Sequence, residues 1–255
     1  TTSSLKYMMM VPVSMLPLGI TGAPTTWHQR SNASYACVPL ASTWYATYDL
    51  AWRLESLYDY YADRFADQYD PIDFLLKVFL FDNQDDLVAA GGHEFMPGGF
   101  MTVNDEVGAR VAMRTHDADW QVLVQMSGAL LYHEAFHQFL AIEISQGGNI
   151  NRQWPTWANE GHGTVFNNLI WTGDGWVDGA IRPKYIASAV ENREGFIPLE
   201  QLLTIDGAGW HELLDEGKVW AVYMESMSLL HFLYYEQDGV HRDLIERYVA
   251  AISRQ

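Results

Sequence analysis

The sequence predicts an α+β fold, with a small mixed sheet in the first half of the chain and mostly helices in the second. Short runs of β-branched and aromatic residues occur up to residue 114, separated by turns that contain glycine and proline. A long apolar pattern with steps of three and four residues then runs from Trp120 to Ile144. Further helical patterns follow after residue 155.

Each expected element of the first half has a local signal. Ser42 or Thr43 can cap a long helix whose apolar residues, from Trp44 to Phe65, recur at helical steps. Leu75–Phe81 has the β-branched and aromatic content of a strand. Further short strands are expected at Met8–Val11, Ser34–Val38, Phe100–Val103 and Val111–Arg114. We expect one of the last two to form an edge of the sheet.

The helices of the second half are delimited by their end signals. The helix that begins at Trp120 ends where Gly147 and Gly148 can adopt positive φ. Pro155 followed by Thr156 predicts the start of the next helix.

Composition and charge predict one domain and exclude several classes of partner. The hydrophobic content of 49% supplies a full core for residues 34–255. A net charge of −17 argues against binding to nucleic acid and to anionic lipid. No apolar run approaches the roughly 18 residues of a transmembrane helix. The single cysteine, Cys37, excludes an internal disulfide, and the oligomeric state is left open.

The N-terminal segment carries an ambiguous signal. Tyr7–Ile20 is apolar and follows Lys6, as in a secretion signal, but its two prolines and weak basic region are atypical. We therefore expect residues 1–33 to form an ordered extension that packs on the domain.

The motif His133-Glu134-Ala135-Phe136-His137 lies within the long apolar helix. Residues four apart share one face of a helix, about 6 Å from each other, so both imidazoles can reach one metal ion. Glu134 can contact water at the metal, which is the position of a general base. Burial of such groups is costly unless they are paired or bind a metal. The alternative is a pair of core histidines bonded to backbone.

Glu160 is the candidate third ligand. It stands early on the helix expected after Pro155, and the 22 residues between His137 and Glu160 are enough for a loop and a return. A carboxylate that faces the first helix would complete a His2Glu set with a fourth position left for water. The alternative is an exposed carboxylate that favours a helix N-terminus.

These two motifs carry a family resemblance. His133–His137 followed by Trp157-Ala158-Asn159-Glu160-Gly161 resembles the gluzincins, the thermolysin-like zinc peptidases. It is similar in particular to the peptidase-MA-like bacterial proteins, in which a proline and a tryptophan precede Asn-Glu-Gly. Less specific similarity extends from Ser34 to the C-terminus: Ala51–Tyr58 resembles the early helix of that family, Leu75–Phe81 its first strand, Ile197–Leu203 a linker, and Val219–Leu233 the helix that follows.

The resemblance implies a zincin-like fold and a zinc metallopeptidase that acts on peptide or protein substrates. It implies that His133, His137 and Glu160 bind Zn²⁺ and that Glu134 is the general base. Related enzymes supply a group that stabilises the oxyanion from a late helix. Tyr223 is the candidate for that role and His231 is its rival, unless both only fill the core. Export is expected, as for many proteins of this family.

Two departures from the family pattern leave other functions open. His162-Gly163 replaces an apolar residue and alanine, and Thr164 replaces an aspartate that would orient a histidine ligand. Asn159 is a candidate substitute for that carboxylate. The alternatives are a catalytically degenerate zincin that serves as a binding or assembly module, and a zinc hydrolase of glycopeptide or cell-wall material, for which the 10 tryptophans are the argument.

Overall fold

The structure is a computed structural model that describes separate segments of the first 145 residues and the continuous stretch 154–252. The described backbone comprises residues 7–10, 29–30, 33–34, 43–67, 76–81, 85, 88, 99–104, 108–114, 120–145 and 154–252, and the described side chains lie in 52–67, 130–145 and 154–252 and at positions 76, 78, 85 and 88.

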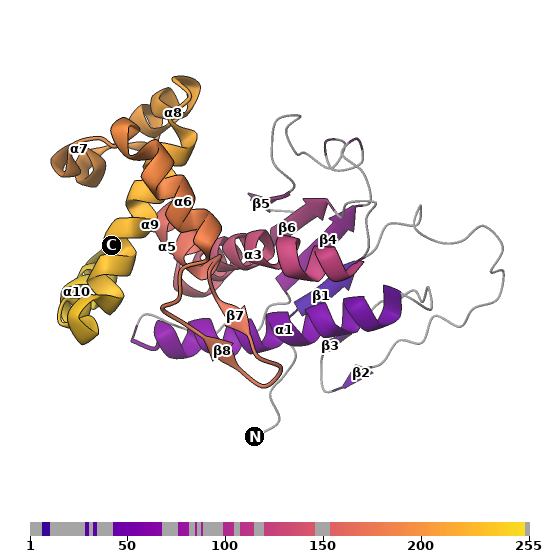
Figure 1. Ribbon diagram of the computed structural model, residues 1–255. Helices are drawn as coiled ribbons and strands as arrows, with labels where there is room; N and C mark the ends of the chain where they lie inside the picture. The colour runs from indigo at the N-terminus through magenta and orange to yellow at the C-terminus, as the bar shows by residue number, and fades with distance from the viewer. Residues whose placement is uncertain are drawn as a thin grey trace.

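A four-stranded mixed sheet forms the first half of the molecule (Figure 1). Its order is β1-β4-β6-β5, with β1 (Tyr7–Met10), β4 (Leu76–Phe81) and β6 (Gly108–Arg114) parallel and β5 (Gly99–Asn104) antiparallel to β6. The expected strands at 75–81, 100–103 and 111–114 are confirmed, as is the strand at 8–11 with a shift of one residue. We expected one of the strands at 100–103 and 111–114 to form an edge of the sheet, and β5 is that edge strand.

A second, two-stranded pairing lies near the N-terminus. β2 (Gln29–Arg30) pairs antiparallel with β3 (Ala33–Ser34). The expected strand Ser34–Val38 therefore overlaps β3 only at Ser34, and residues 35–38 lie outside the described residues.

Two long helices pack along the sheet and against each other. α1 (Thr43–Arg64) lies next to β1, and α3 (Trp120–Phe139) lies next to β5 and β6 (Figure 1). A π-helical turn, η2 (Leu140–Ile144), continues α3 as far as Ser145. The predicted helix from 120 to 144 is thus confirmed, with its last turn widened, a feature often found near functional sites.

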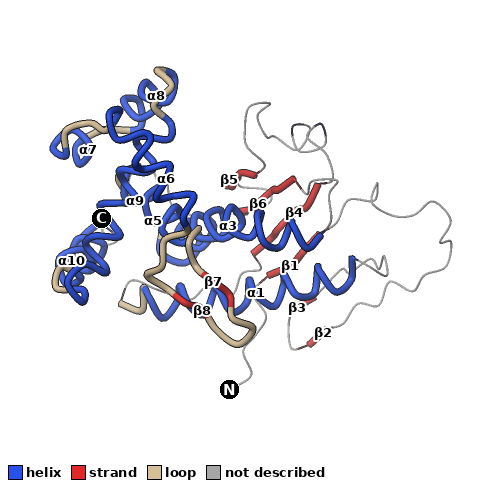
Figure 2. The backbone as a smooth tube through the Cα atoms, viewed as in Figure 1, coloured by secondary structure: helices blue, strands red, loops and turns tan. Residues whose placement is uncertain are grey.

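The second half consists of helices that lie to the left of the sheet in Figure 2, and one short hairpin interrupts them. The elements are α5 (Thr156–Phe166), the hairpin β7 (Ile170–Trp171) and β8 (Trp176–Val177), α6 (Pro183–Asn192), η3 (Arg193–Gly195), α7 (Leu199–Thr204), α8 (Gly207–Asp215), α9 (Val219–Tyr235), η4 (Glu236–Gly239) and α10 (Arg242–Ile252). α5 packs between α3 and α9.

The prediction of a linker at Ile197–Leu203 was wrong for most of this segment. Most of it is helix α7, because Pro198 leads into a run of good helix formers that begins with Leu199 and Glu200. The expected helices at Thr156 and at Val219–Leu233 are confirmed. Within the described part of the chain, no helix is long and apolar enough to span a membrane.

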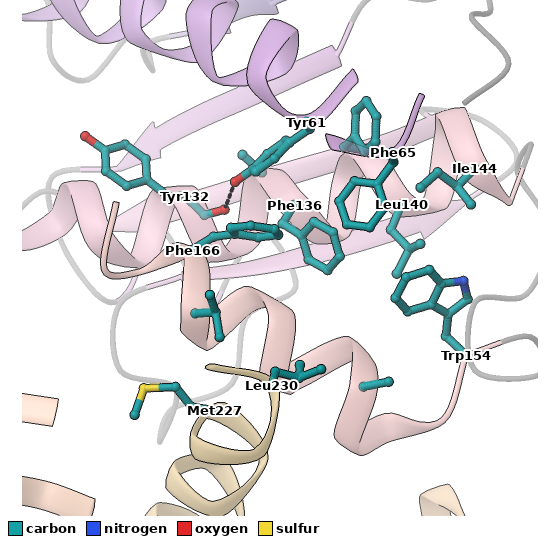
Figure 3. Packing of buried hydrophobic residues seen from close by; sticks show 14 of the residues in the cluster. Tyr61, Phe65, Tyr132, Phe136, Leu140, Ile144, Trp154, Phe166, Met227 and Leu230 are labelled. Atoms are coloured by element: carbon teal, nitrogen blue, oxygen red, sulfur yellow. Dashed lines mark hydrogen bonds between the residues drawn. The ribbon is translucent and has the colours of Figure 1, made fainter. Parts of the chain in front are cut away.

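An aromatic core joins α1, α3 and α5 (Figure 3). Phe65, Phe136 and Phe166 are buried, and their ring centroids lie 5.0 to 6.3 Å apart at angles typical of aromatic packing. The Tyr61 hydroxyl donates to the carbonyl oxygen of Tyr132 at 2.7 Å. This bond fixes α1 against the turn of α3 that begins the His-Glu motif.

A half-buried ionic cluster ties the β7–β8 hairpin to the helices. Asp178 accepts hydrogen bonds from Tyr60 and Tyr235 and forms an ion pair of 2.9 Å with Arg64. The Arg64 guanidinium also lies 4.1 Å from the ring centroid of Tyr234. The cluster therefore connects α1, the residues after β8, and the end of α9.

Replacement of Asp178 by alanine is expected to lower the free energy of unfolding by about 3 kcal/mol, because it leaves the Arg64 charge and two phenol hydroxyls without their shared acceptor. Urea denaturation of both proteins measures the loss. Asp243→Ala is the matched control. The Asp243 side chain is 79% exposed and that of its ion-pair partner Arg247 is 72% exposed, so this pair should contribute little to stability. Equal effects of the two substitutions would contradict a structural role for the cluster.

Candidate metal centre

The candidate site lies where α3 and α5 pack against each other. His133 and His137 are four residues apart on α3 and both are buried. Phe136 and Leu140 on the same helix belong to the aromatic core, so the two imidazoles project from a different part of its surface, toward α5. Glu160 comes from the second turn of α5, which Pro155 starts. The three predicted metal ligands are thus brought together.

The ligand atoms have the spacing of a metal site. Glu160 Oε2 lies 3.1 Å from His133 Nε2 and 3.5 Å from His137 Nε2. One ligand atom from each of the three residues fits within 4.8 Å of the other two. A tetrahedral zinc ion with bonds of about 2.0 to 2.2 Å holds neighbouring ligand atoms about 3.3 to 3.6 Å apart. The residues present therefore fit a divalent ion without rearrangement of the backbone.

Asn159 orients the second histidine. Its side-chain oxygen, which can only accept, lies 2.9 Å from His137 Nδ1, so this nitrogen carries the proton and donates it. The other ring nitrogen, Nε2, then faces Glu160. An outer partner of this kind fixes both the tautomer and the ring orientation of a metal ligand.

Charge within the cluster favours a cation between the three ligands. Burial would lower the pKa of His137, but the attraction of Glu160 outweighs burial and raises that pKa to about 9. Burial would raise the pKa of Glu160, but His137 and the hydrogen bonds from both imidazoles hold it well below its usual value. The ionised Glu160 carboxylate thus attracts a proton to His137. The same negative charge would attract a divalent metal ion bound between the three side chains.

His133 is positioned by packing. Its Nδ1 is buried without a hydrogen-bond partner among the described residues. A Cβ at Gly163 would lie 2.8 Å from this nitrogen, so the imidazole rests directly on the backbone of α5. The Thr164 hydroxyl is not its partner, and it donates instead to the carbonyl oxygen of Glu160 at 2.8 Å. Gly163, which stands where the family pattern has alanine, therefore leaves the space that the His133 ring occupies.

Tyr223 reaches the cluster from α9. Its phenol lies close enough to the Glu160 carboxylate for that charge to act on it, and its ring lies 6.3 Å from that of His133 at an interplanar angle of 26°. Burial and the charges of Glu160 and Glu134 raise the pKa of Tyr223 above its usual value, so the phenol keeps its proton. Glu134 is itself 8% exposed and lies close enough to influence both Tyr223 and His137.

The two other candidate histidines, His162 and His231, do not belong to the ligand cluster. His162 is fully buried, with Nδ1 donating to the Ala158 carbonyl oxygen and Nε2 accepting from the Tyr234 hydroxyl at 2.8 Å. Burial lowers the pKa of His162 to about 3, so its ring stays neutral. His231, the rival of Tyr223, donates to the carbonyl oxygen of Gly179 at 2.9 Å. It stands eight residues after Tyr223, about 12 Å further along α9.

Two residues at the site, Trp210 and Gly163, were not predicted from the sequence to have a role there. Trp210, on α8, is 2% exposed and packs against the ring of Tyr223 at a centroid distance of 5.6 Å. Gly163 was noted only as a departure from the family pattern. No local pattern marks Trp210, because its contact joins residues from two separate helices.

Family models, curated proteins and solved structures contain no match to the chain. The fold and the site define an α+β protein with a cluster of two buried histidines and a partly buried glutamate that can hold a metal ion.

Gly163→Ala is expected to weaken binding of zinc about tenfold or more, because the added methyl group forces the His133 ring out of its ligand position. Competition with a chromophoric chelator measures the affinity. Gly207→Ala is the control, because its Cβ would meet nothing within 4 Å. Unchanged affinity in a folded Gly163→Ala protein would show that packing on α5 does not set the His133 ring.

Proposed function

We propose that this chain is a zinc-dependent metallopeptidase of the gluzincin type, with a zincin-like fold. The observation that carries the proposal is the cluster of His133, His137 and Glu160 at the interface of α3 and α5, with Glu134 between the two histidines in sequence. Two imidazoles and one carboxylate form the donor set of catalytic zinc sites that retain an open position.

The protein residues divide the chemistry of peptide hydrolysis among them. Zinc, when bound, supplies a Lewis acid that polarises a carbonyl and lowers the pKa of water. The Glu134 carboxylate accepts a proton from the attacking water and later delivers it to the leaving nitrogen. Asn159 holds the proton on Nδ1 of His137 and so keeps the Nε2 lone pair available for the ion.

Tyr223 is the proposed donor to the developing negative charge. Its phenol keeps its proton and lies beside both Glu160 and Glu134. A phenol in this position can donate a hydrogen bond to the oxygen of a substrate carbonyl as charge accumulates there.

The sheet offers an edge for an extended substrate. β5 is a terminal strand of the described sheet and lies next to α3, which carries the two histidines. Its outer backbone groups are not used by the pairing with β6. We propose that a peptide substrate adds to this edge as an extra strand, which orients its backbone across the metal centre.

Glu134→Gln is expected to retain bound zinc and to lower the rate of cleavage of an unfolded protein substrate by about 10² to 10⁴-fold, because glutamine cannot accept the proton. Single-turnover assays on the zinc-loaded variant measure the loss. Glu160→Ala is the comparison: it should lose zinc affinity, and with it activity.

Two results would count against this assignment. Turnover retained by Glu134→Gln would remove Glu134 from the role of base. Unchanged zinc affinity in Glu160→Ala would mean that the third ligand is another residue.

A catalytically degenerate metal-binding module is the second candidate. It is favoured by the buried His133 Nδ1, which lacks an acceptor among the described residues, and by the threonine that stands where related enzymes carry an aspartate. A wild-type protein that holds zinc but cleaves no unfolded protein would support this candidate over a peptidase.

Hydrolysis of glycopeptide or cell-wall material has weaker support. The tryptophan content was its argument, but Trp154, Trp157 and Trp210 are at most 2% exposed and therefore serve the core. Trp52 and Trp220, at 55% and 56% exposed, stand on different helices.

A further inference from the structure

Tyr223 has two aromatic neighbours beside the metal centre. Its ring centroid lies 6.3 Å from that of His133, at 26°, and 5.6 Å from that of Trp210, at 59°. These rings come from α3, α9 and α8, so the contacts connect three helices that are distant in the sequence. Tyr223 thus joins α8 to the helix that carries two of the candidate ligands.

The phenol of Tyr223 depends on this confinement. The Tyr223 ring lies at 26° to the His133 ring, and a change in this orientation would move its hydroxyl relative to the metal centre. A tyrosine ring turns about two side-chain bonds, and a wall of packed atoms is what restricts it to one rotamer. Trp210 provides such a wall on the side where α8 approaches Tyr223.

Trp210 is itself firmly held. The Asp206 side chain caps the start of α8 by accepting from the backbone N–H of Gly209 at 2.9 Å. The backbone N–H of Trp210 donates to the Asp206 carbonyl oxygen at 2.9 Å. The indole therefore presents a fixed surface.

The surroundings of Trp210 differ from those of the other buried tryptophans. Trp154 packs against Phe65, Phe136 and His162, and Trp157 packs against Tyr248. Among the described residues, none of these partners is a phenol on which the charges of Glu160 and Glu134 act, whereas Tyr223, the partner of Trp210, is.

We propose that Trp210 is a positioning residue that holds the Tyr223 phenol over the metal centre. It acts through Tyr223 and needs no contact with substrate. The catalytic consequence rests on the proposed peptidase function, whereas the positional claim does not. Helix α8 thereby becomes part of the site, although it lies more than 45 residues beyond Glu160 in the sequence.

The test follows the Tyr223 ring by NMR in full-length, zinc-loaded protein with labelled tyrosine and histidine rings. Tyr223→Phe assigns the hydroxyl signal. We expect contacts between the Tyr223 and His133 rings in the wild type, their loss in Trp210→Leu, and their recovery in Trp210→Phe. Leu213→Ala removes packing from the same helix and should leave these contacts intact. Unchanged contacts in Trp210→Leu would overturn the proposal.

Kinetics add a second readout. Because a small displacement of a transition-state donor is costly, Trp210→Leu should lower kcat about tenfold or more with little change in KM. Combined with Tyr223→Phe, it should cause no further loss. Additive losses would overturn the coupling. If the protein shows no peptidase activity at all, the proposed function fails, while the NMR result still decides the position of Tyr223.

Discussion

The contact of one carboxylate with two imidazoles across the α3–α5 interface is the constraint on which the remaining structure depends. Burial alone would favour the neutral form of Glu160, but its interactions with the two imidazoles keep it ionised. The Glu160 charge in turn raises the pKa of His137. Such an arrangement costs free energy unless opposite charge fills it. The hydrophobic helix α3 carries these groups because the helix beside it supplies the complementary charge.

The separation of the two helices is set by residues that are not ligands. Gly163 lets the His133 ring lie on the backbone of α5, and a Cβ at Gly161 would come within 3.0 Å of the Ser226 carbonyl oxygen on α9. His162, between these glycines, bonds to Tyr234 on α9. The sequence Glu-Gly-His-Gly thus places one ligand and fixes the distances on both sides of its helix. The charge of Glu160 acts on the Tyr223 phenol because α9 packs closely against α5.

Sequence reasoning succeeds here where the signal is local. The spacing of His133 and His137, the start of α5 after Pro155, and the strands and helices with regular apolar patterns all follow from neighbouring residues. The geometric meeting of Glu160 with both imidazoles was expected through the family resemblance more than through its own surroundings. The contacts of Trp210 with Tyr223 and of Gly163 with His133 were not predicted, because each joins two helices through packing alone. The short helix α7 was missed because a six-residue helix leaves almost no periodicity.

The metal content of the protein, purified without added metal or chelator, tests the central claim most directly. Elemental mass spectrometry of the wild type and of the double variant His133→Ala, His137→Ala provides the measurement. The account predicts about one zinc per chain in the wild type and none in the variant. A wild-type chain that contains no metal, and takes up none on titration with zinc, would contradict it.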